Sequence, residues 1–185
     1  MLSLAHVSLG LRTALLVFSL IVISLIMAGP GFHQTLTLHG RSVPSGGDGR
    51  HPIDRWNSIE GMSGLWSQLS VILLSPLMAI AAVVMGVLIL LGNSNLAPFQ
   101  PIYMALCAVM TTIFMSVEFH FAFSYFNANE GYRRYLAKDL NTDQFTFSTQ
   151  VRGWIAAAVF LLFSAIIYAA DAVLIFFRGF GVIDC

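Results

Sequence analysis

Four stretches of this chain are each long enough and apolar enough to cross a lipid bilayer as a helix. A helix rises about 1.5 Å per residue, so a hydrocarbon core of about 30 Å takes roughly 20 apolar residues. The second stretch contains Pro76, which predicts a kink. The sequence predicts an all-α integral membrane protein, a single four-helix domain over residues 1–185. The expected spans are residues 11–29, 65–91, 102–126 and 154–177.

The composition agrees with a lipid-facing surface. Hydrophobic residues make up 57% of the chain, charged residues 10%, and the mean hydropathy is +0.80. A soluble domain carries about 25% charged residues because its surface must be hydrated. The formal net charge is zero, and no basic stripe is apparent, so we expect no nucleic-acid partner.

Four spans place both termini on one side of the bilayer, together with the short linker 92–101. Loop one, residues 32–64, and loop three, residues 127–153, then lie on the other side. Loop one contains the segment HGRSVPSGGDGRHP, whose glycine and proline content predicts irregular backbone.

Two of the spans carry a family resemblance. The stretch from Ala157 to Asp171, and the first span with Arg12 at its start, resemble the last and first helices of MARVEL-domain proteins. The resemblance implies an M-shaped four-helix domain with cytosolic termini, in the plasma membrane or a vesicle membrane. It also implies a non-enzymatic protein that organises membrane apposition, vesicle trafficking or cell junctions. The implied partners are membrane lipids including cholesterol, further copies of the chain or other membrane proteins.

Three alternatives remain open. Gly64-Leu65-Trp66, with Trp56 before it, is similar to the Gly-Leu-Trp signature of claudin-like junction proteins. That group also has two disulfide-bonded cysteines in loop one, and this loop has none. The second alternative is a small accessory subunit of a larger channel, transporter or respiratory complex. The third is an independent transporter or channel.

Two arguments about the orientation of the chain in the membrane disagree. Positive residues are retained in the cytosol, and a count over short loops gives Arg12 and Arg178 on the terminus side against seven on the loop side. That count places the loops in the cytosol. The resemblance, and Arg12 directly before the first span, place the termini there instead, which is the orientation we expect. The seven loop-side positives are Arg41, Arg50, Arg55, Arg133, Arg134, Lys138 and Arg152.

Charged side chains inside a span cost about 2.5–3.5 kcal/mol each on insertion scales, so they usually mark a specific contact. Glu118 and Asp171 lie at different depths, which argues against a shared carboxylate pair. Asp171 lies near the depth of Arg12, and we predict a contact between them that ties the first span to the fourth. The alternative is a local hydrogen bond between Asp171 and Tyr168. His120 lies in an aromatic stretch typical of the membrane boundary.

Chemistry is not indicated elsewhere. We find no phosphate-binding loop, nucleophile elbow or intramembrane protease pair, and expect no enzyme. His33, His39 and His51 match no zinc spacing, and a single histidine within the spans argues against haem, so no cofactor is expected. Cys107 and Cys185 are not placed to pair, and Cys185 is a candidate for palmitoylation.

Small residues and one amphipathic segment complete the predictions. Small side chains let helices approach closely. Tyr132, Tyr135, Leu136 and Leu140 follow helical spacing in loop three and predict a short amphipathic helix. Its basic face either contacts lipid headgroups or is simply solvated. The expected helix-packing residues are Ala79, Ala82, Gly86, Ala165 and Ala169, and the candidate headgroup residues are Arg133, Arg134 and Lys138.

Overall fold

The computed structural model describes residues 4–38, 41–44, 49–50, 65–142 and 144–177. Its helices are α1 (Leu4–Ala28), α2 (Leu65–Leu90), α3 (Gln100–His120), α4 (Glu130–Leu140) and α5 (Arg152–Phe177). A 3₁₀ helix, η2 (Ser94–Phe99), precedes α3, and a π-helix, η3 (Phe121–Tyr125), prolongs it. The strands are β1 (Pro30–Leu38), β2 (Arg41–Pro44), β3 (Gly49–Arg50) and β4 (Phe145–Val151).

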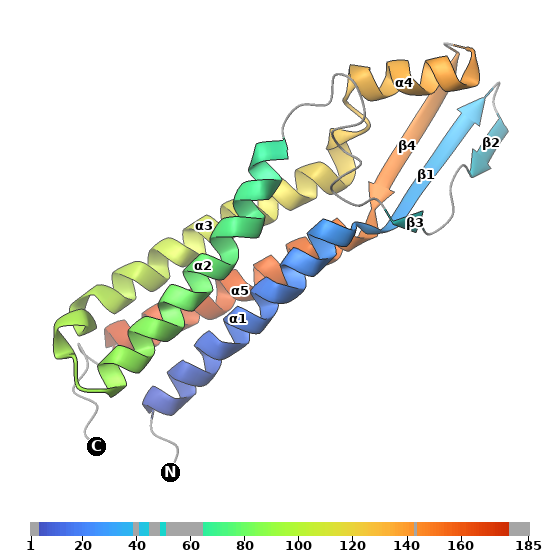
Figure 1. Ribbon diagram of the computed structural model, residues 1–185. Helices are drawn as coiled ribbons and strands as arrows, with labels where there is room; N and C mark the ends of the chain where they lie inside the picture. The colour runs from blue at the N-terminus through green and yellow to red at the C-terminus, as the bar shows by residue number, and fades with distance from the viewer. Residues whose placement is uncertain (1–3, 39–40, 45–48, 51–64, 143, 178–185) are drawn as a thin grey trace.

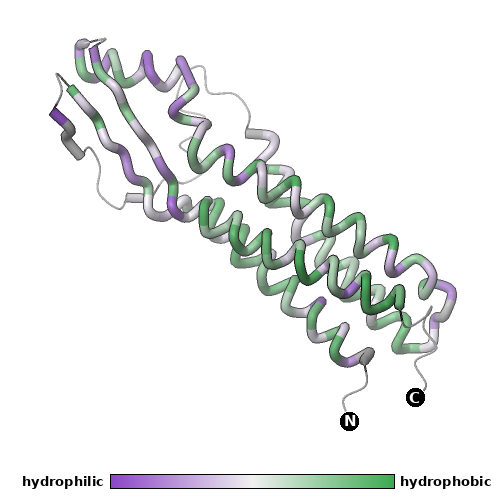
Figure 2. The backbone as a smooth tube through the Cα atoms, turned by 180° about the vertical axis from the view of Figure 1, so that it is seen from behind, coloured by the Kyte–Doolittle hydropathy of each residue, from purple (hydrophilic) through white to green (hydrophobic). Residues whose placement is uncertain are grey.

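Four of the described helices are long enough and apolar enough to cross a membrane, as the sequence predicted. These are α1, α2, α5 and the helix that contains α3. They form an elongated bundle in which α1 begins and α5 ends at the same end (Figure 1). Hydrophobic residues are concentrated along these helices, whereas α4 is largely hydrophilic (Figure 2). Many large apolar side chains point outward from the bundle, among them Leu73, Leu106 and Phe163.

The two loops at the other end are joined in one antiparallel sheet. β1 is the central strand. β4 pairs along one of its edges, and β2 and β3 pair along the other. The register of the long pair runs from Phe32 opposite Val151 to Leu38 opposite Phe145. The predicted irregular backbone of loop one is therefore wrong where β2 and β3 form. The sequence PGFHQTLTL of β1 supplies the missing signal, because its residues alternate between the two faces of a sheet.

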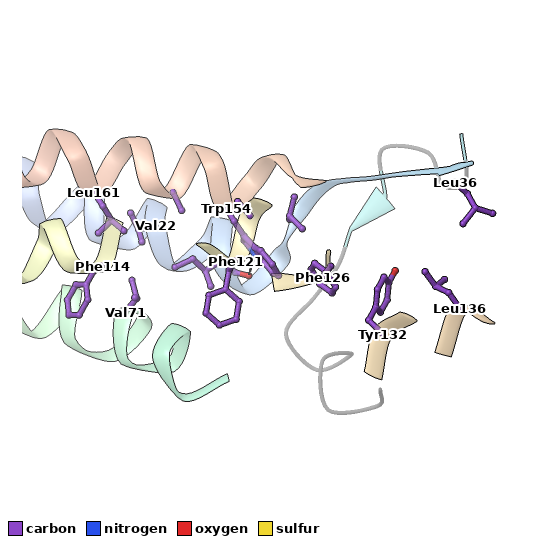
Figure 3. Packing of buried hydrophobic residues seen from close by; sticks show 14 of the residues in the cluster. Val22, Leu36, Val71, Phe114, Phe121, Phe126, Tyr132, Leu136, Trp154 and Leu161 are labelled. Carbon is purple, nitrogen blue, oxygen red and sulfur yellow. Dashed lines mark hydrogen bonds between the residues drawn. The ribbon is translucent and has the colours of Figure 1, made fainter. Parts of the chain in front are cut away.

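Helix α4 covers the inner face of this sheet. Tyr132 and Leu136 of α4 are buried in the same hydrophobic cluster as Leu36 of β1 and Phe145 of β4. Asn129 caps the start of α4 by accepting a hydrogen bond from the Tyr132 backbone N–H at 3.1 Å. We call β1–β4 together with α4 the sheet unit. Its core continues into the bundle through Phe126, Phe121 and Trp154 (Figure 3).

The sheet unit is connected directly to the bundle. Gly29 is the one residue between α1 and β1, and β4 runs into α5 without a gap. Gly29 adopts a positive φ of 48°, which favours glycine and lets the chain turn from helix to strand. At the second junction, a Cβ on Gly153 would lie 2.4 Å from Pro30 Cδ and 2.9 Å from Pro30 O. Glycine is therefore required there for the two junctions to pack together.

Candidate functional site

A buried guanidinium connects all four long helices near the end where α1 begins. Arg12 of α1 and Asp171 of α5 form an ion pair with 2.9 Å between Nε and Oδ2, and their side chains are 1% and 0% exposed. Arg12 Nη1 donates to the backbone oxygen of Ala82 in α2 at 3.1 Å, and Nη2 donates to Gln100 Oε1 at the start of α3. Each of the three nitrogens has its own acceptor, which offsets the cost of burying the charge.

The carboxylate of Asp171 is satisfied on both oxygens. Oδ2 accepts from Arg12, and Oδ1 accepts from the Ser8 hydroxyl at 2.7 Å. The predicted Arg12–Asp171 contact is confirmed, and the hydrogen bonds to the two carboxylate oxygens come from Arg12 and Ser8. The ion pair therefore holds the first helix of the bundle against the last.

Gly86 and Ala82 make room for this guanidinium. A Cβ on Gly86 would lie 2.9 Å from Arg12 Nη1 and 3.4 Å from its Cδ. Ala79 and Ala82 are buried on the same helix, and Ala165 is buried in α5, whereas Ala169 is exposed. The small residues of α2 thus pack against neighbouring helices as predicted. Of the two alanines in α5, only Ala165 is buried in the bundle.

The second buried acid has a different partner. Gln68 Nε2 of α2 donates to Glu118 Oε2 of α3 at 3.0 Å, and both side chains are 0% exposed. The remaining oxygens, Gln68 Oε1 and Glu118 Oε1, have no hydrogen-bond partner among the described residues. The two acids belong to separate polar contacts, one with Gln68 and one with Arg12. His120 is exposed beyond Glu118, with its ring edge-on to Phe121.

Trp154 secures the opposite end of the bundle. Its Nε1 donates to the backbone oxygen of Ile26 at 3.3 Å, which ties the start of α5 to the end of α1. Its ring stacks on Phe126 with centroids 5.8 Å apart and an interplanar angle of 12°. The aromatic contact carries the bundle core into the sheet unit, so the sheet is held by packing as well as by the two chain junctions (Figure 3).

Polar side chains lie under the sheet, facing α4. Gln34 and Thr149 are cross-strand partners and both are buried. Burial raises the pKa of Tyr132 to about 12. The Tyr132 hydroxyl therefore stays protonated at neutral pH. Gln34 Nε2 and Thr149 Oγ1 have no hydrogen-bond partner in the described part of the chain.

The outer edge of the sheet is capped at one position by a side chain. Asn127, which follows η3, accepts from the Thr149 backbone N–H at 2.8 Å and donates to the Thr149 backbone oxygen at 3.3 Å. Its Nδ2 also donates to Phe123 O at 2.6 Å. The carboxamide of Asn127 takes the place that a neighbouring strand would occupy beside Thr149.

The predicted amphipathic helix forms, and its apolar side faces protein. Tyr132 and Leu136 pack against the sheet, while Tyr135 is 52% exposed. Arg133 and Lys138 are exposed, and Arg134 makes an exposed ion pair with Glu130 at 3.5 Å. An exposed pair of this kind contributes little to stability. The basic side chains are thus accessible on the outside of the sheet unit.

Several predicted residues lie outside the described ranges or apart from one another. His39, His51 and Cys185 are outside the described residues, so the histidine grouping and the palmitoylation site are not placed. His33 lies on the outer side of β1, opposite Gln150. Cys107 is buried in α3 among helix-packing residues.

Sequence reasoning missed the amide side chains of these contacts. Gln68, Gln100 and Asn127 each complete a buried or edge contact, and none was singled out. A signal was present for Gln68, a polar residue near the start of an apolar span, where an unpaired amide is costly. Comparison of the chain with protein-family models, with curated proteins and with solved structures finds no match.

Proposed function

We propose that this chain is a non-enzymatic, multi-pass membrane protein that organises membrane contacts through its sheet unit. The observation that carries the proposal is the direct connection of the sheet to two helices of the bundle, at Gly29 and at the β4–α5 junction. A recognition surface on such a support keeps a fixed orientation relative to the bilayer. The outward apolar side chains of the bundle support a lipid environment, because exposed apolar surface of this extent is rare on soluble monomers.

The proposal retains the expected type of protein, a MARVEL-like organiser of membrane apposition, trafficking or junctions with cytosolic termini. Buried polar groups at both ends of the bundle support a structural role for the spans. Arg12 and Asp171 bind each other, and Glu118 binds Gln68. The surface left for recognition is the outer side of the sheet unit, together with the lipid-facing helices and their lipid or cholesterol contacts.

The claudin-like junction alternative is supported by one observation. Loops one and three share a sheet, and in that group the loop disulfide holds an extracellular sheet together. Here the central strand is paired on both edges, although loop one contains no cysteine. Pairing of β1 with the whole length of β4, and packing of α4 beneath, supply the support that a disulfide would otherwise give.

A tethering assay tests the proposal. Purified protein is reconstituted into labelled vesicles, which are mixed with membranes isolated from the cells that express it, and vesicle pairing is counted by two-colour fluorescence. Protein-free vesicles are the control. We expect pairing well above the control. Pairing at the control level, together with a stoichiometric larger complex purified in mild detergent, would assign the chain instead as an accessory subunit.

A further inference from the structure

The sheet has two edges of different character. β2 on one side has four residues and includes Arg41 and Pro44, a charge and a residue without N–H, both of which protect an edge from pairing. β4 on the other side has the sequence FTFSTQV, with no charge and no proline. By these criteria the β4 edge is the one open to another strand.

The Asn127 contact shows which residues of β4 point their backbone N–H and C=O groups to this edge. Thr149 points its N–H and C=O at Asn127 and hence away from β1. In an antiparallel ladder this orientation alternates, so Phe147 and Phe145 point their N–H and C=O groups to the same outer edge. No side chain or strand of the described chain pairs with them there. The edge is capped at Thr149 and open at Phe145 and Phe147.

The open half is the part farthest from the bundle. Phe145 pairs with Leu38 at the far end of β1, whereas Val151 runs into α5. A strand rises about 3.4 Å per residue, so Phe145 lies roughly 20 Å beyond Val151, the residue that directly precedes α5. The strands continue roughly along the bundle direction, with β4 running back toward it (Figures 1 and 2).

We propose that the β4 edge pairs antiparallel with β4 of a second copy of this chain in a facing membrane. This inference rests on the proposed function and names its partner. A strand antiparallel to β4 runs away from the first bilayer, which requires its own bilayer to lie on the opposite side. A copy in the same membrane, related by an axis along the membrane normal, presents β4 in the parallel direction instead.

The register is set by which groups are free. With the two-fold axis at Thr146, Phe145 of each copy lies opposite Phe147 of the other, and the two pairs exchange about four hydrogen bonds. The Thr146 side chains then face each other across the axis on the outer face, where they are exposed. Hydroxyl pairs of this kind are favourable across strands. With so few hydrogen bonds, a single pair of copies binds weakly. Many copies on two facing membranes bind at once, which raises the overall affinity.

Introducing a charge of either sign at Thr146 tests the pairing. Thr146→Lys places two like-charged lysine side chains opposite each other, with their Cβ atoms about 5 Å apart across the axis, and Thr146→Glu does the same with carboxylates. The matched control is Thr35→Lys, on the same face of the central strand, where the two charges would be roughly 20 Å apart and largely screened. Vesicles bearing wild-type protein are mixed with vesicles bearing the same protein, and pairing is counted.

We expect wild-type and Thr35→Lys vesicles to pair, and Thr146→Lys or Thr146→Glu vesicles to lose pairing with their own kind. Lysine vesicles mixed with glutamate vesicles should pair again, which also shows that both variants fold. Undiminished pairing of Thr146→Lys vesicles, an equal loss in Thr35→Lys, or no recovery in the mixture overturns the proposal. If wild-type vesicles pair with native membranes but not with each other, the strand pairing is wrong and the proposed function stands.

Discussion

Arg12 is a buried charge that depends on its partners in the other three long helices. Removing Asp171 leaves the guanidinium without its counter-ion, which costs about 3–5 kcal/mol in a buried pair. We therefore expect Asp171→Leu to lower the free energy of unfolding in detergent micelles by that amount. The double variant Arg12→Met with Asp171→Leu should recover much of the loss, since no charge remains buried. Losses that simply add up would contradict the coupling.

Gly86 tests the space around the same guanidinium. Alanine is favoured over glycine in a helix by about 0.5–1 kcal/mol. Gly10 of α1 has nothing within 4 Å of an added Cβ, so Gly10→Ala should stabilise the protein. Gly86→Ala should instead destabilise it by about 1–3 kcal/mol, because the new Cβ displaces Arg12 Nη1. Thermal unfolding of the two variants decides this, and equal stabilisation would show that Arg12 moves aside freely.

The residue contacts differ in how far the sequence predicts them. Arg12 and Asp171 carry opposite charges, and counting residues from the helix ends places them at one depth, so their contact follows. The amides of Gln68, Gln100 and Asn127 bind acids, cations or backbone equally well. Their partners depend on how each helix is rotated about its axis, and residue counting does not determine that rotation.

At the scale of elements, the close packing of Gly153 on Pro30 couples strand β1 to helix α5. An added Cβ at Gly153 would overlap Pro30 Cδ at 2.4 Å and also approach a backbone oxygen that has little freedom to move. We expect Gly153→Ala to separate the two junctions and to speed hydrogen exchange of the amides in β1 and β4. Amides in the middle of α2 should exchange as before. Unchanged exchange in the two strands would show that the junction does not hold the sheet.

Asn127 is expected to stabilise the edge of β4. Thr149 is 1% exposed, so removing its carboxamide partner leaves a buried N–H and C=O unsatisfied, at a cost of about 1–3 kcal/mol. Asn127→Ala should lower the unfolding free energy by this amount. Asn93→Ala, at an exposed linker position without a side-chain cap bond, is the control and should change little. A matching effect of the two substitutions would remove the role assigned to Asn127.

The sequence predicts the elements unevenly. The long helices follow from the length of the apolar runs, and α4 from the spacing of Tyr132 and Leu136. The all-α prediction is wrong in omitting strands β1 and β4, although both sequences alternate, and alternation does not say which strand pairs with which. β1 pairs with β4 because the end of α1 lies beside the start of α5. That contact is a property of the assembled bundle and not of either segment alone.

On the scale of the whole molecule, we expect the four spans to hold the sheet unit on one side of a bilayer. That arrangement requires the sheet and the α2–η2 linker to lie on opposite sides. Positions for probes are available in both places, since Thr146 on β4 and Asn93 in the linker are exposed. Cys185 is replaced by serine to leave only the buried Cys107 as a native thiol.

The most direct test introduces cysteine at Thr146 or at Asn93 and adds an impermeant thiol reagent to intact cells and to permeabilised cells. We expect one of the two positions to be labelled in intact cells and the other only after permeabilisation. With cytosolic termini, the Thr146 position is the one labelled in intact cells. Labelling of both positions from the same side would contradict the four-span arrangement, and with it the separation of the sheet unit from the chain ends.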